Sequence, residues 1–274
     1  MKVGYQGNHG TFSEIAALDY FVGQSFEPYG CRNFVEIMEK VEAGTFDYAV
    51  IPVENTTTGI ISRSYDLFYQ YQIQAVGEIN VPIRHNLITV SGAKIEEIQK
   101  IYSHPEALSQ CQDFFFTHPS FIPCTFQDTA RSGKYVKECG NPTIAAIGSW
   151  RAAEYYDLPI ARKDVQDSDC NITRFLVVTA HSYQDQEADK TSLMVVLKHR
   201  PGSLYNILGI LAKNGIDIVR LESRPIVGKP FEYRFYIDFY GNCWKREIQE
   251  VLHEMEMRCE EMKIIGCYKS FKNV

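Results

Sequence analysis

Several features that define particular classes of protein are missing from this chain of 274 residues. Its first ten residues, MKVGYQGNHG, lack the apolar core of a signal peptide, and no apolar run reaches transmembrane length. Basic residues are not in excess, because the net charge is −6 at pH 7, and a general nucleic-acid binder needs a basic surface. The sequence therefore predicts a cytoplasmic protein with no membrane and no nucleic-acid partner.

Two kinds of cofactor site are also missing. The eight cysteines contain no C-x-x-C pair and no zinc-like spacing, so we expect reduced thiols in the core rather than metal ligands. Gly4, Gly7 and Gly10 are spaced G-x-x-G-x-x-G, whereas the dinucleotide fingerprint is G-x-G-x-x-G. This spacing argues against a nucleotide cofactor.

What the chain does contain is enough apolar sequence for about two domains. Its composition is 45% hydrophobic and 23% charged, and a domain commonly takes about 100–200 residues. The stretch AHSYQDQEADK at 180–190 is polar and nearly free of aliphatic residues, which is typical of a linker. We predict one domain over residues 1–180, a linker over 181–190 and a second domain over 191–274.

The first domain alternates short apolar runs with helical patterns, which predicts an α/β sheet. Ligands of such sheets bind at the carboxyl ends of strands, so the strand-to-helix turns are candidate site segments. The predicted strands are residues 2–7, 46–54, 98–105 and 143–148, and the predicted helices are residues 12–21, 33–44, 59–70, 106–116, 128–138 and 149–156.

The first two of these turns are rich in polar residues. At 10–13, Gly-Thr-Phe-Ser opens a helix whose free N–H groups either bind an anion or are capped by Thr11 or Ser13. The loop ENTTTG at 54–59 has more hydroxyl and amide groups than capping requires. That surplus favours contact with a ligand.

The third turn is YSHPEALSQC at 102–111. Ser103 ends a strand, a proline then opens a helix, and Gln110 lies in its second turn. His104, which precedes the proline, is interpreted as a loop residue rather than a catalytic base.

A hydroxyl and a guanidinium stand at the mouth of one apolar strand. Thr173 and Arg174 directly precede the run FLVV, which continues from Phe175. An arginine that loses water needs an anionic partner. Either another element supplies a carboxylate or a ligand does.

Together these segments resemble the prephenate dehydratase catalytic domain. The motifs appear in one order across the first domain: G-T-F-S-E at 10–14, P-V-E-N-T at 52–56, S-H-P-E-A at 103–107 and T-R-F at 173–175. The resemblance implies a fold of two α/β lobes with a cleft, similar to periplasmic binding proteins. It also implies decarboxylating dehydration of prephenate to phenylpyruvate, with no metal and no organic cofactor.

Roles for individual residues follow from the same resemblance. Thr173 is implied to donate to, or orient, the leaving hydroxyl. Arg174 is implied to clamp a substrate carboxylate, and Phe175 to pack and fix the strand. Substrate contact is implied for Asn55, Ser103 and Gln110, and also for Thr11, Ser13 and Thr56.

The second domain has a pattern of its own, which predicts a ferredoxin-like β-α-β-β-α-β fold. RNA-recognition modules share this order, but the third strand lacks their basic, glycine-containing motif. The predicted strands are residues 191–199, 216–227, 231–241 and 263–268, and the predicted helices are residues 202–215 and 243–259.

This segment resembles an ACT regulatory domain. The resemblance implies phenylalanine as an effector, feedback inhibition, and a homodimer or homotetramer formed through these domains. It departs from the family at Ser203 and Tyr205, and at Val219, where a small hydroxyl residue is usual. The implied effector residues are Gly202, Ser203, Leu204, Glu222, Ser223, Arg224 and Pro225.

Two alternatives stay open at this point. Arogenate dehydratase shares the motifs and makes phenylalanine directly. A small-molecule binding or sensor protein of the same fold would have no catalysis and would need no Thr173. For Glu222 and Arg224, the alternative is a structural ion pair at a subunit interface.

Overall fold

The computed structural model describes residues 1–271, which form two compact units. The first unit combines residues 1–37, 49–61 and 79–175, and the second combines residues 38–48, 62–78 and those from 176 onward. The division falls inside strands β3 (Tyr48–Asn55), β5 (Gln74–Pro82) and β11 (Ile172–Thr179). The predicted domain boundaries stay a prediction, and residues 181–189 form no helix or strand.

A five-stranded sheet forms one part of the first unit. Its order is β10–β6–β9–β7–β8, with β7 parallel to both neighbours and β6 antiparallel to β9 and β10. Parallel pairs require crossover connections, and helices α4, α5 and α6 supply them. The elements are β6 (Asn86–Ile88), β7 (Lys100–Ser103), α4 (Pro105–Ser109), α5 (Gln112–Thr117), β8 (Ile122–Thr125), α6 (Thr129–Cys139), β9 (Ile144–Gly148) and β10 (Ile160–Arg162).

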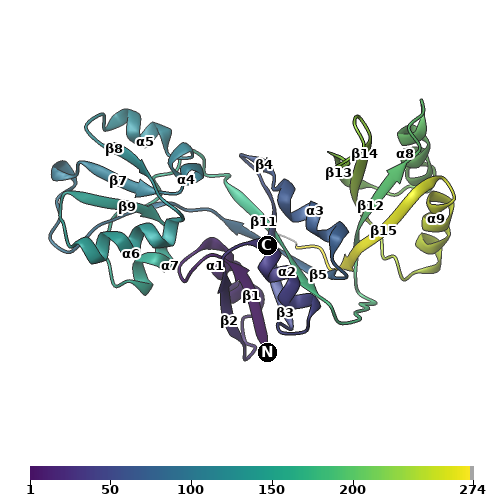
Figure 1. Ribbon diagram of the computed structural model, residues 1–274, viewed down its shortest axis with the longest axis horizontal. Coiled ribbons are helices and arrows are strands. Elements are labelled where there is room, and N and C mark those ends of the chain that lie inside the picture. Colours follow the sequence, from purple (N-terminus) through teal and green to yellow (C-terminus); the bar gives the residue numbers. More distant parts are fainter. Residues whose placement is uncertain (272–274) are drawn as a thin grey trace. The chain divides into compact units, whose positions relative to one another are not determined.

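Helices cover both faces of this sheet, because apolar side chains alternate from face to face along its strands (Figure 1). On one face, Leu87 and Ile147 pack in a core with residues of α4 and α5. On the other face, Ile88 and Ala146 pack with α6 and with α7 (Trp150–Tyr155). With both faces buried, the ends of the strands are left for a site.

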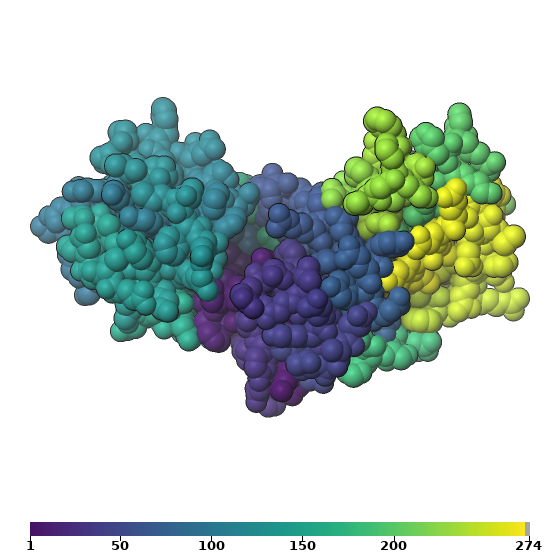
Figure 2. Space-filling model, viewed as in Figure 1, coloured from purple at the N-terminus to yellow at the C-terminus, as the bar shows by residue number. Residues whose placement is uncertain are grey.

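The N-terminal segment adds a β-α-β unit: β1 (Lys2–Gln6), α1 (Phe12–Tyr20) and β2 (Glu27–Cys31), with the strands parallel. Gly10 precedes α1 with a φ of 91°, and a Cβ built on it would lie 2.6 Å from the Cα of Ala152. Only glycine fits this backbone conformation and this close approach. The start of α1 therefore lies directly against α7, and Figure 2 shows the N-terminal segment in purple beside the teal surface.

The C-terminal part of the second unit has the predicted order β12–α8–β13–β14–α9–β15. Its strands pair antiparallel in the order β13–β14–β12–β15, which is the ferredoxin-like arrangement, and both helices share one core that includes Leu211 and Leu252. The bounds are β12 (Lys190–Leu197), α8 (Ser203–Lys213), β13 (Ile218–Pro225), β14 (Tyr233–Tyr240), α9 (Arg246–Glu256) and β15 (Cys259–Tyr268).

Earlier segments of the chain complete this second unit. Strand β15 pairs in parallel with β5 through Gly266 and Ala75. Helix α3 (Ser62–Gln70) is joined to β14 because the Tyr236 hydroxyl donates to the Tyr65 carbonyl at 2.9 Å. Helix α2 (Phe34–Glu42) lies at the division between the units.

The predicted α/β fold class is confirmed, with corrections to individual elements. The helix predicted at 59–70 begins only at Ser62, because β4 (Gly59–Ile60) pairs back on β3. The helix predicted at 106–116 is two helices, which separate at Gln110 and Cys111. Within residues 1–271, no helix is long and apolar enough to cross a membrane, and no group of three or more His, Cys, Asp or Glu side chains is placed to hold a metal ion.

Candidate active site

The end of β3 and the start of β11 are joined by hydrogen bonds in the first unit. The Thr56 N–H donates to the Ile172 carbonyl at 2.9 Å, and the Ile172 N–H donates to the Thr56 hydroxyl at 2.9 Å. The same hydroxyl donates to the Cys170 carbonyl at 2.5 Å. Thr56 therefore holds together the two segments that carry Asn55 and Thr173.

The buried Asn55 side chain determines how the Thr173 hydroxyl is used. Its Oδ1 accepts from the backbone N–H groups of Thr57 at 2.9 Å and Thr58 at 3.0 Å, which fixes the amide because backbone N–H groups only donate. Its Nδ2 then donates to Thr173 Oγ1 at 3.0 Å and to Asn171 Oδ1 at 2.7 Å. In the described part of the chain, Thr173 has no acceptor for its own proton, so a role as a donor to a ligand stays a prediction that this bonding pattern allows.

Gln110, at the separation between α4 and α5, extends these contacts. Its Oε1 accepts from Asn171 Nδ2 at 2.8 Å and from His85 Nε2 at 3.0 Å. Its Nε2 faces the Glu106 carboxylate at 3.3 Å and the Thr57 hydroxyl at 3.4 Å. We call the connected side chains the amide network, which consists of His85, Gln110, Asn171, Asn55 and Thr173.

Sequence reasoning does not identify two members of the amide network, Asn171 and His85. Asn171 stands two residues before Thr173, and a second polar residue before a buried strand was an available signal. His85 is the middle of three consecutive polar residues, 84–86, and nothing in that run distinguishes it from its neighbours. Its side chain is 2% exposed, and burial lowers its pKa below the ordinary value, with the hydrogen bond to Gln110 partly offsetting this.

Arg174 has a protein carboxylate near its guanidinium. Its Nη1 lies 3.6 Å from the Glu54 carboxylate, and the side chains are 12% and 40% exposed respectively. Of the two partners that the sequence leaves open, the internal one is therefore present. A role for Arg174 in holding the substrate stays a prediction.

Ser103 and Phe175 are both deeply buried. The Ser103 hydroxyl donates to the Ile147 carbonyl at 2.7 Å and thereby joins β7 to β9. Phe175 is 2% exposed and packs within the protein. For Ser103, substrate contact stays a prediction.

A cavity of about 550 Å³, the α1 cavity, opens at the start of α1. Thr11 caps this helix, because its hydroxyl accepts from the Glu14 N–H at 3.4 Å. The Glu14 carboxylate in turn accepts from the Gly10 N–H at 2.6 Å. Ser13, Arg32 and Arg131 also line the cavity. The helix N-terminus and the two guanidinium groups favour an anion, while the Asp128 carboxylate, which also lines the cavity and lies 3.8 Å from Arg131, opposes one.

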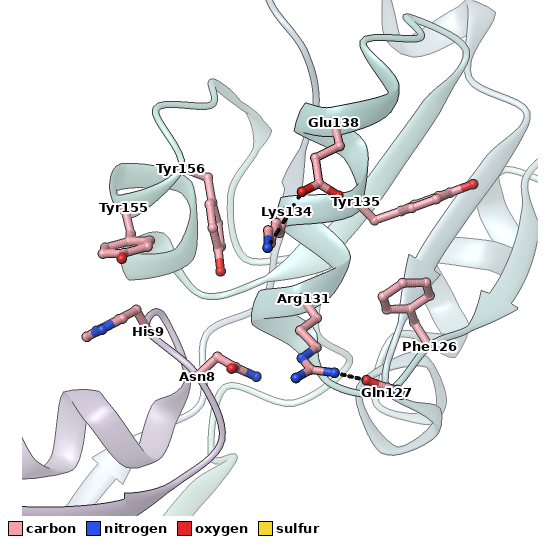
Figure 3. Close-up of a pocket in the computed structure, with 10 residues that line it drawn as sticks. All are labelled: Asn8, His9, Phe126, Gln127, Arg131, Lys134, Tyr135, Glu138, Tyr155 and Tyr156. Carbon is pink, nitrogen blue, oxygen red and sulfur yellow. Dashed lines mark hydrogen bonds and ion pairs between the residues drawn. The ribbon is translucent and has the colours of Figure 1, made fainter. Parts of the chain in front are cut away.

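A second cavity of about 660 Å³, the tyrosine cavity, adjoins the first, since Asn8, Gln127 and Arg131 line both. Figure 3 shows Tyr155 and Tyr156 on one side of it and Phe126 and Tyr135 on the other. Both volumes fall within the range of about 300–1,000 Å³ that is typical of small-molecule sites. The pair of cavities thus combines cationic groups with aromatic rings.

The predicted effector motifs fall into two groups in the second unit. Gly202 is the N-cap of α8, and Ser203 and Leu204 line a small cavity of about 120 Å³. The other motif lies on β13, where Arg224 donates to the Asp66 carboxylate of α3 at 3.0 Å. Arg224 therefore has an ion-pair partner within its own chain.

The fold and the site define an α/β protein with amide and hydroxyl groups gathered where β3 ends and β11 begins. A model of the family described as prephenate dehydratase matches residues 3–183. The bifunctional chorismate mutase/prephenate dehydratase of Enterobacter agglomerans is 33% identical over 274 residues, which cover 98% of this chain and 70% of that protein.

Solved structures agree with this match. Prephenate dehydratase of Arthrobacter aurescens, in complex with L-Phe, superposes with a TM-score of 0.90 at 28% identity, over 98% of this chain and 90% of that one. GqqA, described as a novel type of quorum-quenching acylase, superposes with a TM-score of 0.89 at 27% identity, over 99% and 98%.

The chain belongs to the prephenate dehydratase family, whose reaction is the decarboxylating dehydration of prephenate to phenylpyruvate in phenylalanine biosynthesis. It is therefore an enzyme, a carbon–oxygen lyase. These matches do not favour arogenate dehydratase or a binding protein without catalysis. The family model ends at residue 183, so the ACT assignment of the following residues stays a prediction.

Proposed function

We propose that the amide network is where prephenate loses its ring hydroxyl, with Thr173 as the donor. The observation that carries this is the hydrogen bond from Asn55 Nδ2 to Thr173 Oγ1 at 3.0 Å. Because this bond occupies a lone pair of the oxygen, the hydroxyl proton is directed elsewhere and is available to the departing group.

The reaction breaks two bonds of the substrate. The bond from the ring to its carboxylate breaks, carbon dioxide leaves, and the electron pair completes the aromatic ring. The ring C–O bond breaks at the opposite carbon, the departing hydroxyl takes the proton of Thr173 and leaves as water, and Thr173 regains a proton from solvent. Donation from Thr173 stabilises the charge that develops on this oxygen.

The two carboxylates of prephenate need cationic or N–H partners, and the α1 cavity offers both. The backbone N–H groups at the start of α1, next to Ser13, favour an anion. Arg131, which lines both cavities, supplies a guanidinium. Arg174 is the second proposed clamp, because it directly follows the proposed donor Thr173 on β11.

Turnover of prephenate by the purified full chain tests this proposal. We expect phenylpyruvate to form, which is measured by its absorbance in alkali. Arogenate serves as the matched control, because it differs only in having an amino group where the prephenate side chain has a keto group. No turnover of prephenate would sink the proposal, and a higher kcat/KM for arogenate would contradict the substrate assignment.

We propose further that residues 191–274 are an ACT domain that binds phenylalanine where two copies of the chain meet, in a homodimer or homotetramer. Strand β13 is at the edge of its sheet, so its backbone groups can pair with another chain. Val219 and Leu221 on this strand are 39% and 41% exposed. The cavity at Ser203 is about 120 Å³, well below the roughly 300 Å³ of a typical ligand site, so a second chain is needed to enclose an amino acid.

Phenylalanine is expected to inhibit turnover of prephenate. If the coupling free energy between the effector site and the active site is about 1–3 kcal/mol, the affinity for prephenate should fall by about 5–150-fold. Inhibition requires that phenylalanine prefer a state whose active site is less competent. The measurements are calorimetric titration and turnover with and without phenylalanine, with leucine as the control ligand. Binding without inhibition would contradict the proposed coupling between the two sites. No binding at millimolar concentration would contradict the proposed effector site itself.

We place the protein in the cytoplasm, and its cysteine spacing supports this. The eight cysteines are scattered along the sequence, without the paired spacing of a disulfide-rich secreted chain.

A further inference from the structure

Two members of the amide network have no assigned role, although each is only 2% exposed: His85 and Asn171. We propose that they are positioning residues, which hold the amides of Gln110 and Asn55 in the one orientation that leaves the Thr173 hydroxyl as a donor to the substrate. This inference rests on the proposed function of Thr173. It concerns how the donor is prepared rather than which residue donates.

The direction of each hydrogen bond follows from one fixed end. Backbone N–H groups fix Asn55, so its Nδ2 faces Asn171 at 2.7 Å. The atom of Asn171 that receives this bond is therefore Oδ1, and its Nδ2 must face Gln110, where it donates to Oε1 at 2.8 Å. Each amide thus has only one orientation that satisfies its neighbours.

The same reasoning determines the protonation of His85. Gln110 Oε1 only accepts, so the ring nitrogen at 3.0 Å from it, Nε2, carries the proton. The other nitrogen, Nδ1, is buried and has no hydrogen-bond partner within residues 1–271. A second proton there would find no acceptor, and burial lowers the pKa of the ring, so His85 is a neutral donor.

Asn171 is the member that connects separate segments of the chain. It precedes β11 and contacts both the end of β3, through Asn55, and the turn after α4, through Gln110. His85 lies behind the wall of the α1 cavity. The ring of Phe12 lines that cavity and packs edge-on against the His85 ring, with 5.5 Å between the ring centroids. The network therefore runs from the cavity wall to the proposed donor.

Paired substitutions separate positioning from packing. His85→Gln keeps a donor at the place of Nε2, whereas His85→Met fills similar space without one. We expect His85→Met to lower kcat by about 10–100-fold with little change in KM, and His85→Gln to stay within about threefold of the parent. Asn86→Ala is the control, because Asn86 is 4% exposed, bonds only backbone carbonyls and lies outside the network.

Asn171→Asp reverses one bond without changing shape. A carboxylate still accepts from Asn55 but cannot donate to Gln110, so the Gln110 amide must turn and present Nε2 to it. His85 Nε2 would then face a donor, and the proton is expected to move to Nδ1. Nitrogen-15 NMR of protein with labelled histidine side chains distinguishes the two tautomers. The His85 signals are assigned as those that are missing in His85→Gln.

The outcomes distinguish this inference from the proposed function. An Nε2–H tautomer that changes to Nδ1–H in Asn171→Asp, together with the kcat difference between His85→Met and His85→Gln, supports it. An Nδ1–H tautomer in the parent protein, or equal kcat for both His85 variants, overturns it. If the parent shows the Nε2–H tautomer but no prephenate turnover, the proposed function fails, and with it the positioning role, while the bonding pattern remains.

Discussion

Thr173→Ala should lower kcat for prephenate by about 10²–10⁴-fold while leaving KM and folding nearly unchanged. The substitution removes one small hydroxyl, so it exposes little area and leaves only a minor cavity. It also removes a hydroxyl whose proton has no acceptor in the described part of the chain and is available to a ligand. The measurement is steady-state turnover of prephenate, with circular dichroism to confirm the fold.

Two further variants of β11 make this test specific. Thr173→Ser restores the hydroxyl and should recover most of the activity. Thr179→Ala is the matched control, because Thr179 is also buried on β11 and its hydroxyl donates to the Asp47 carbonyl at 2.8 Å. If Thr173→Ala kept more than about half of the parent kcat, Thr173 would not be the donor.

The parts of the fold that could be predicted from sequence are those with strong hydrophobic periodicity. All six elements of the C-terminal β-α-β-β-α-β segment were predictable, because β13 alternates, β12 is a nearly continuous apolar run and the helices have an apolar face. Strands β2 and β10 were not. β2 reads EPYGC, with a proline and a glycine that weaken a strand pattern, and β10 is only three residues long.

Helix α3 shows how a tertiary contact alters a local pattern. Residues 59–70 read as one helix, but Gly59 takes a φ of 78° and pairs with Asn55 at the end of β3. This short hairpin displaces the helix start to Ser62 and shapes the loop that fixes the Asn55 amide. Local propensity does not record such a pairing.

The sequence could predict candidate site residues whose side-chain type implies a chemistry. It could not predict the residues whose role depends on a contact made in the folded chain. Asn55, Gln110 and Thr173 were each predicted as site residues. Asn55 bonds Thr173 directly, but Gln110 is connected to Asn55 through Asn171, which contacts partners 116 and 61 residues away. Ser103 has a structural contact that the sequence does not show, since its hydroxyl joins two strands, and its contact with substrate stays a prediction. Long-range pairing of this kind exists only in the folded chain.

Lys190→Met is expected to give the largest loss of stability, about 3–5 kcal/mol. Lys190 Nζ lies 3.0 Å from both carboxylate oxygens of Glu78, and the two side chains are only 9% and 3% exposed. Removing the ammonium leaves a buried carboxylate whose charge is no longer balanced by its partner. The backbone N–H of Phe271, which donates to Glu78 at 2.9 Å, cannot replace that charge.

The melting temperature, followed by calorimetry, should fall by roughly 6–20 °C at 2–4 °C for each kcal/mol. Adding Glu78→Gln should recover much of the loss, because the amide removes the buried charge and still accepts from Phe271. Lys269→Met is the matched control: its ion pair with Glu187 is 3.8 Å long and the side chains are 68% and 82% exposed, so its loss should cost less than about 1 kcal/mol. Equal losses of stability in Lys190→Met and Lys269→Met would contradict this prediction, because they would mean that the buried ion pair contributes no more than a surface one.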